Sequence, residues 1–146
     1  MNTLSRLILG TAFSLALAAC AAGPRAGSAS LYDRLGGQPA ITAVVDDFVA
    51  NVAADKRING QFANTNIPRL KMLLVEQICA GTGGPCQYTG RDMKSAHAHL
   101  KIGEADFAAL VEDLSRTLDK FKVPAKDQGE LIAILAPMKG DIVTVK

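Results

Sequence analysis

Residues 88–102 read YTGRDMKSAHAHLKI, and this stretch contains the only histidines of the chain, His97 and His99. The chain has no Trp, and Tyr32 is its only Tyr outside the stretch. Metal or proton chemistry that requires an imidazole therefore depends on residues 88–102. Most of the remaining sequence is apolar with helical spacing, which is the pattern expected of a scaffold around a single site.

The bulk composition predicts one globular domain without affinity for nucleic acids. The chain has 146 residues, of which 49% are hydrophobic, so it can bury a substantial core. Only 5% are aromatic, which means that aliphatic side chains must fill most of that core. The formal net charge is +2 and the basic residues do not cluster, whereas a nucleic-acid-binding surface is strongly basic.

Residues 1–19 are predicted to be a signal peptide. Their apolar run, residues 7–17, is shorter than the roughly 20 residues that a membrane-spanning helix needs. The run ends in Leu17-Ala18-Ala19-Cys20, which resembles a bacterial lipobox and implies lipid attachment at Cys20. The alternative is an ordinary secretory signal followed by a chance cysteine.

The signal peptide and the lipid anchor implied by this resemblance divide the chain into three parts, of which the signal peptide, residues 1–19, is the first. Residues 20–30 carry the lipidated cysteine and a tether rich in Gly, Ala, Ser and Pro. Residues 31–146 form the folded domain. Because no Asp follows Cys20, the resemblance implies an exported protein anchored in the cell envelope, on the periplasmic side of the outer membrane.

Apolar residues at helical spacing predict an all-α domain. Four substantial helices are expected, with approximate ranges 38–54, 67–79, 104–122 and 125–144. Short helical turns are expected at 31–35 and 93–98. Pro137 lies inside the last helix and should kink it, because proline removes one backbone hydrogen bond.

Helical geometry separates the two histidines. Residues two positions apart on a helix point about 200° apart, and in an extended chain they point in opposite directions. His97 shares a helical face with Met93, so we expect His97 to face inward and His99 to face water. A buried imidazole requires partners for both nitrogens, which a metal or haem iron and a backbone carbonyl can supply. A purely structural core histidine is the alternative.

The cysteines offer two further interpretations. Cys79 and Cys86 could join the histidines in a zinc site, but Cys-x6-Cys with His-x-His matches no common zinc spacing. In an oxidising compartment the two cysteines could instead form a disulfide, or they could stay as buried thiols. The sequence leaves these last two possibilities open, because pairing depends on how closely the two Cα atoms approach.

Five motifs in order resemble the group I truncated haemoglobins. They span residues 31 to about 143, and they are LYDRLGG at 31–37, FxxTNxxRLK at 62–71, GGP at 83–85, YTG at 88–90 and MKxxH at 93–97. The resemblance implies an all-α truncated globin, a two-over-two helical sandwich that holds haem b. It identifies His97, which follows Met93-Lys94, as the proximal iron ligand.

The resemblance also assigns contacts to individual residues. The side chains implied to contact the haem face, its edge and its proximal side are Phe62, Tyr88, Met93 and Phe107. The side chains implied to meet the propionates are Thr65, Arg69 and Lys94, since cations and hydroxyls at a pocket rim offset carboxylate charge. For Arg69 and Lys94, simple solvation is the alternative.

The distal side departs from the family pattern. The family often has a Tyr where this chain has Val49, and a polar residue where it has Leu74. The expected distal wall is therefore apolar, and it consists of Phe48, Val49, Leu70, Leu74 and Ile78. Lys71 and Met72, considered as second axial ligands, lie about 100° and 200° from Leu70 on the helix, off the face of this wall.

Three functions follow as candidates. The first is reversible binding of diatomic gases (O2, NO and CO), with NO dioxygenase or peroxidase turnover as a side activity that needs an unidentified reductase. The second is a six-coordinate haem module for electron transfer or redox sensing at the envelope. The third is a globin-like interaction domain without haem, and His97 and Phe62 argue against it.

Overall fold

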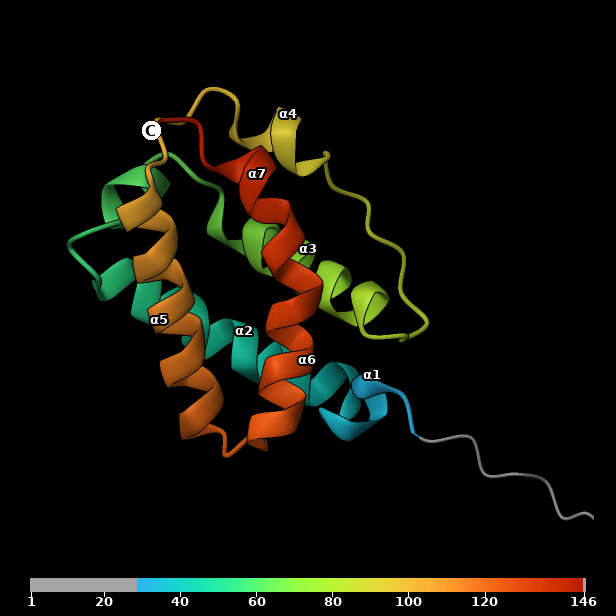
Figure 1. Cartoon of the computed structure of the whole chain (residues 1–146). Helices are drawn as coiled ribbons and strands as arrows, with labels where there is room; N and C mark the ends of the chain where they lie inside the picture. Colours follow the sequence, from blue (N-terminus) through green and yellow to red (C-terminus); the bar gives the residue numbers. More distant parts are fainter. Residues whose placement is uncertain (1–28, 146) are drawn as a thin grey trace, which may run out of the picture.

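A computed structural model describes residues 29–145 of the chain (Figure 1). The predicted signal peptide, the lipidated Cys20 and nearly all of the tether lie outside these residues, so they stay predictions. Within residues 29–145 every regular element is helical, and none of these helices is both long and apolar enough to cross a membrane.

Each predicted helix or turn is present to within a few residues, and the 3-10 turn η1 is an element that was not predicted. The elements are α1 (Leu31–Arg34), α2 (Gly37–Ala54), η1 (Asn59–Phe62), α3 (Ile67–Gly81), α4 (Met93–His97), α5 (Glu104–Lys120), α6 (Ala125–Leu135), η2 (Ala136–Met138) and α7 (Lys139–Ile142). The last predicted helix is divided because Pro137 interrupts the α-helical hydrogen bonds, and the chain passes through the 3-10 turn η2 before α7.

Local sequence signals explain where the helices begin. The Asn66 side chain accepts a hydrogen bond from the Arg69 backbone and starts α3, with Pro68 in the first turn. Asp92 caps α4 in the same way, because its carboxylate accepts from the backbone N–H of Ser95 at 2.8 Å. Gly36, with φ of 92°, forms the left-handed turn between α1 and α2.

The long helices form two layers around a shared core. Helix α2 packs against both α3 and α5, and Figure 1 shows α5 and α6 in front of α2 and α3. The side chains that meet between the layers are aliphatic, as the low aromatic content predicted. The largest fully buried apolar side chains are Leu118, Leu131 and Val45, which are at most 2% exposed.

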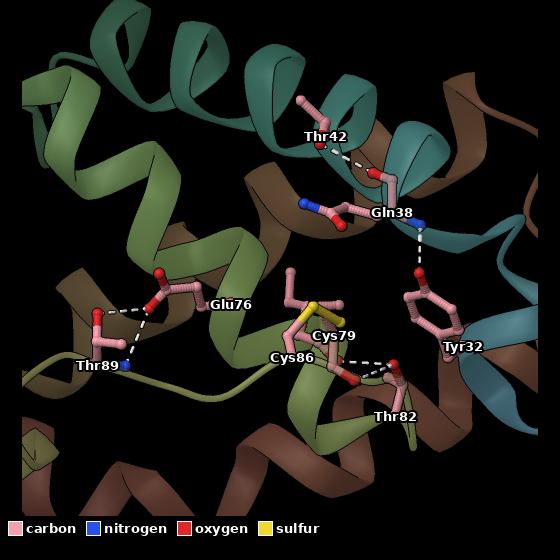
Figure 2. The surroundings of a disulfide bond; sticks show 9 residues. Tyr32, Gln38, Thr42, Glu76, Cys79, Thr82, Cys86 and Thr89 are labelled. Carbon is pink, nitrogen blue, oxygen red and sulfur yellow. Dashed lines mark hydrogen bonds between the residues drawn. A yellow bond between two sulfur atoms is a disulfide. The ribbon is translucent and has the colours of Figure 1, made fainter.

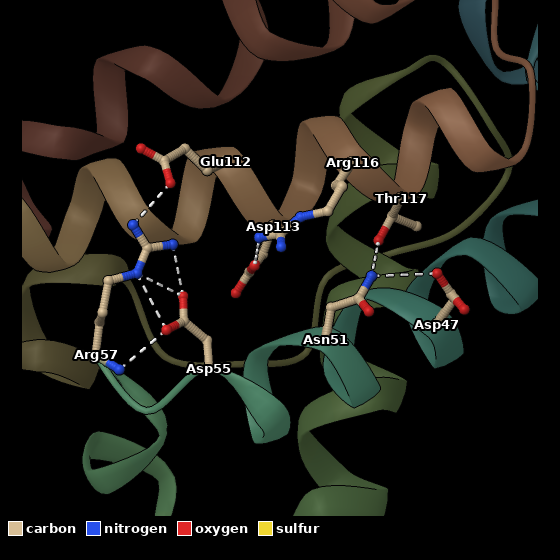
Figure 3. A network of polar contacts seen from close by, with 8 residues as sticks. All are labelled: Asp47, Asn51, Asp55, Arg57, Glu112, Asp113, Arg116 and Thr117. Atoms are coloured by element: carbon tan, nitrogen blue, oxygen red, sulfur yellow. Dashed lines mark hydrogen bonds and ion pairs between the residues drawn. The ribbon is translucent and has the colours of Figure 1, made fainter.

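A polar network joins α2 to α5 (Figure 3). The Asn51 amide donates to the Thr117 hydroxyl at 2.8 Å, and Thr117 is fully buried. Asp113 is 1% exposed and pairs with Arg116, but its Oδ2 has no hydrogen-bond partner among the described residues. Burial therefore raises the pKa of the Asp113 carboxyl.

The chain after α3 is pinned by a disulfide that the sequence left open. Cys79 and Cys86 are bonded, with their Cα atoms 5.7 Å apart, and Tyr32 of α1 lies beside them (Figure 2). Gly84 fits between these groups. A Cβ added at Gly84 would lie 2.5 Å from Tyr32 Cδ2 and 2.7 Å from Cys79 Sγ, so this position has no room for a side chain.

The substitution Asp113→Asn tests the cost of the buried charge. Because the pKa of Asp113 is raised in the folded state, the ionised carboxylate destabilises the fold above that pKa. This penalty disappears as the pH falls toward the ordinary aspartate value. We expect Asp113→Asn to raise the thermal midpoint at neutral pH and to lose this advantage near about pH 4. Circular dichroism melts across this pH range measure it, and a variant less stable than wild type at neutral pH would contradict it.

The substitution Gly84→Ala tests the contact at the disulfide. Overpacking against Tyr32 and Cys79 should lower the free energy of unfolding by about 1–3 kcal/mol, as measured by urea denaturation. Gly129→Ala is the matched control, because a Cβ there meets nothing within 4 Å inside helix α6. That control should gain about 0.5–1 kcal/mol. Equal effects of the two substitutions would show that Gly84 is not sterically required.

Candidate functional site

A cavity of about 820 Å³ lies between the two helix layers. Its walls come from α2, from η1 and the loop after it, from α3, α4, α5 and α6, and from the η2–α7 region, and most of the lining side chains are aliphatic or aromatic. Polar residues occur mainly where the cavity opens, and they include Gln61, Asn64, Asn66, Arg69 and Arg91. A cavity of this size and composition is typical of a site for a large, mostly apolar small molecule.

The predicted site residues converge on this cavity with two exceptions. The predicted residues that line it are His97, Phe48, Phe62, Thr65, Arg69, Leu70, Leu74, Ile78, Tyr88, Met93 and Phe107. Val49 does not line the cavity; it is a core residue, 5% exposed, on the neighbouring face of α2. Lys94 is exposed on α4 and is also absent from the lining.

The His97 imidazole is oriented by its own helix. His97 is half-buried, and its Nδ1 lies 2.7 Å from the backbone carbonyl oxygen of Met93, one turn earlier in α4. A carbonyl oxygen can only accept, so Nδ1 carries the proton and donates it. In the neutral imidazole this leaves the Nε2 lone pair free for a metal.

The prediction for His99 was only partly correct. The side chain is exposed, as expected, but it also lines the rim of the cavity. Helical phase does not set the direction of the His99 side chain, because α4 ends at His97 and the chain continues as a turn. Both imidazoles of the protein therefore border the same cavity, and only His97 has a nitrogen bonded to the backbone of its own helix.

No role was predicted for Gln77, which lines the cavity from α3. Its amide nitrogen lies 3.0 Å from the Met138 sulfur and 3.9 Å from the Met93 sulfur. Gln77 thus links α3 to η2 and to the helix that carries His97. Its place four residues after Leu73, on the cavity face of α3, is the signal that could have identified it.

Two other sets of candidate ligands do not reach the cavity. The Lys71 amine lies 2.9 Å from the Asp46 carboxylate, and Met72 is 45% exposed, so both side chains point away from the lining. A zinc site that includes the cysteines is excluded, because Cys79 and Cys86 are bonded to each other. Within residues 29–145, no group of three or more His, Cys, Asp or Glu is arranged to hold a metal ion.

Hydrogen bonds order the chain that forms the mouth of the cavity before α4. The Tyr88 hydroxyl donates to the backbone carbonyl of Arg91 at 2.8 Å, and burial raises the pKa of this phenol. The hydrogen bond from Ser95 lowers the pKa of the Asp92 carboxyl, so its charge at the first turn of α4 is retained well into the acid range.

Comparison with known proteins identifies the class. The profile of the family described as bacterial-like globin matches residues 30–144, and the chain belongs to that family. The chain is similar to the group 1 truncated hemoglobin GlbN of Mycolicibacterium paratuberculosis, with 38% identity over 82% of this chain and 88% of the relative. It is 34% identical to the GlbN of a Nostoc species, over 78% of this chain and 97% of that relative.

Solved structures agree with this assignment. The Fe(III) truncated hemoglobin of Tetrahymena pyriformis matches with a TM-score of 0.75 and 28% identity, over 79% of this chain and 98% of that one. The 2/2 hemoglobin of a Synechococcus species, solved with covalently attached heme, matches with a TM-score of 0.75 and 30% identity over the same shares of the two chains. The predicted all-α truncated globin fold is confirmed, and membership of this family implies a haem-binding globin.

Proposed function

We propose that the protein binds haem b in the 820 Å³ cavity, with His97 as the proximal iron ligand, and that it reversibly binds diatomic gases. The observation that carries the proposal is the hydrogen bond between His97 Nδ1 and the Met93 carbonyl, on the wall of that cavity. This bond selects the tautomer whose Nε2 can bind a metal and restricts rotation of the ring.

The residues around the cavity fit a haem group. The apolar walls suit the faces of a porphyrin, and Phe62 and Phe107 supply aromatic surface. Thr65 and Arg69 lie at the polar opening, where a hydroxyl and a guanidinium can bind carboxylates. When bound, the iron would supply gas coordination and redox chemistry, while the protein supplies position and polarity.

The wall contributed by α2 and α3 is mostly apolar, with Arg69 at the opening and Gln77 as its polar members. Its side chains include Phe48, Leu70, Leu74 and Ile78, none of which can donate a hydrogen bond. The amide of Gln77 is directed to the sulfurs of Met138 and Met93, on the side of α4. A bound O2 molecule would therefore lack stabilisation by a donor, whereas CO and NO depend less on one.

The apolar wall favours gas binding over the six-coordinate alternative. A second axial ligand must reach the iron from the side opposite His97, and Lys71 and Met72 both point away from the cavity. His99 borders the cavity only at its exposed rim. We therefore place electron transfer or redox sensing second.

Turnover and location complete the proposal. An NO dioxygenase or peroxidase side activity would require an electron donor, which we expect to be a separate reductase.

Export with a lipid on Cys20 and attachment to the outer membrane rest on the sequence of residues 1–20. Labelling of cells with radioactive palmitate, with Cys20→Ser as control, tests this anchor.

The first test of the site is its absorption spectrum. We expect wild-type protein to bind one equivalent of haem with a Soret band, and we expect His97→Ala to lose or strongly shift that band because the iron loses its protein ligand. His99→Ala is the matched control, since it removes the other imidazole at the same cavity. A Soret band retained in His97→Ala and lost in His99→Ala would reverse the assignment.

The second test introduces a hydrogen-bond donor into the apolar wall. Leu74→Gln should slow dissociation of O2 by roughly ten- to a hundredfold, because a hydrogen bond to a polarised ligand contributes about 1.5–3 kcal/mol. Stopped-flow replacement of O2 by CO measures the rate. Leu74→Ile, which supplies no donor, should leave the rate within a few-fold of wild type. Slow dissociation from the wild-type protein would contradict an apolar distal wall.

A further inference from the structure

Helix α4, which carries His97, is the least supported helix of the cavity. It extends only from Met93 to His97, and its principal packing partner is α7, itself a short helix. Figure 1 shows α4 at one end of the molecule, joined to α3 by a long segment without regular structure. The position of His97 must therefore depend strongly on what holds the segments before and after α4.

The segment after α4 is held by the C-terminal residues. The backbone N–H groups of Thr144 and Val145 donate to the Ile102 carbonyl at 2.9 and 3.1 Å, and the Ile102 N–H donates to the Thr144 hydroxyl at 3.0 Å. The Lys139 amine of α7 adds an ion pair with Glu104. These contacts join the downstream end of α4 to the chain that follows α7.

The segment before α4 is held by two attachments, and both lead to α3 (Figure 2). One is the disulfide between Cys79 and Cys86. The other is the Glu76 carboxylate, which accepts from the Thr89 backbone N–H at 2.9 Å and from the Thr89 hydroxyl at 2.8 Å. In the described part of the chain, no other hydrogen bond or ion pair joins residues 85–92 to an element other than α4.

The two attachments lie on the same side of α3, one helical turn apart. Glu76 and Cys79 are three residues apart, so they share a face of the helix. The segment that they hold continues directly into the cavity wall, which includes Tyr88, Arg91 and Met93. Fixing this segment at two points removes most of the freedom with which it could carry His97 away from the cavity.

We propose that Glu76 and the Cys79–Cys86 disulfide form a proximal clamp, a pair of positioning contacts that hold His97 over the haem site, and that reduction of the disulfide accelerates haem loss. The inference rests on the proposed haem function. Cys79 is fully buried, whereas Cys86 is half-buried, so Cys86 Sγ is the sulfur that a reductant reaches first.

The redox step balances as an ordinary thiol–disulfide exchange. A thiolate of an external dithiol attacks Cys86 Sγ, the Cys79–Cys86 bond breaks, and Cys79 leaves as a thiolate that takes up a proton. The second thiol of the reductant then displaces Cys86, which is released as a thiol, and the dithiol becomes a cyclic disulfide. Once the bond is open, the two solvent-exposed hydrogen bonds to Glu76 are the only polar contacts within residues 29–145 that join residues 85–92 to α3.

The test measures haem transfer from the purified, haem-loaded protein to excess apomyoglobin, with and without dithiothreitol. We expect dithiothreitol to accelerate haem loss about tenfold in wild type. The double variant Cys79→Ser/Cys86→Ser should lose haem at the faster rate under both conditions. If replacement of the buried Cys79 prevents folding, the single variant Cys86→Ser, which also lacks the disulfide, takes the place of the double variant. Glu76→Gln should add a further acceleration of a few-fold after reduction.

A second readout separates positioning from general loss of stability. The iron–histidine stretching band in the resonance Raman spectrum of the ferrous protein should broaden or shift on reduction, because it reports the orientation of the His97 ring. Asp127→Asn is the stability control, since it breaks a part-buried ion pair with Arg34 far from α4. It should lower the melting temperature while leaving the Raman band and the haem-loss rate within twofold of wild type.

The outcomes are distinguishable. If the oxidised protein shows no Soret band after haem addition, the haem proposal itself fails. If the oxidised protein binds haem but dithiothreitol changes neither the rate of haem loss nor the Raman band, the clamp is overturned and the haem site stands. The clamp is also overturned if Asp127→Asn accelerates haem loss as much as reduction does, because reduction then acts through the overall stability of the protein.

Discussion

The packing of two helix layers around an 820 Å³ apolar cavity is the constraint on which the rest of the structure depends. Helices that surround such a cavity cannot all bury their apolar faces against one another, since protein interiors are otherwise close-packed. Helix α2 packs on both α3 and α5, and all three helices also contribute side chains to the cavity. Leu118 and Leu131 belong to the close-packed core, whereas Val45 of the same core also borders the cavity.

This constraint explains why covalent and polar contacts concentrate around α4. A helix with one and a half turns contributes little stability by itself, and α4 faces the cavity instead of the core. Its place is therefore set by the Asp92 cap at its start, by the disulfide and Glu76 upstream, and by Thr144 downstream. The hydrogen bond from His97 to the Met93 carbonyl then orients the imidazole relative to α4.

The fold and most of the site could be predicted before the structure. Apolar periodicity located the long helices because each buries one continuous stripe. Most of the residues implied by the motifs shared with truncated haemoglobins line the cavity, but much of the lining, including the part contributed by residues 132–142, was not predicted. The failures share a physical cause. Val49 follows the cavity residue Phe48 in the sequence but is buried in the core. His99 reaches the rim of the cavity because α4 ends at His97. Both depend on helix rotation and helix length, which sequence spacing defines only to within about a residue.

The sequence by itself determined the class of protein, the order and approximate ranges of the long helices, and His97 as the candidate iron ligand, because these follow from local patterns and from shared motifs. The tertiary structure decided which groups meet across the chain. The pairing of Cys79 with Cys86, the hydrogen bonds between Glu76 and Thr89, and the placement of Gln77 against Met138 all require segments to approach in space. Residues 88–102 supply the histidine, and contacts from α3 and the C-terminal segment hold it in place, since a helix as short as α4 cannot position itself.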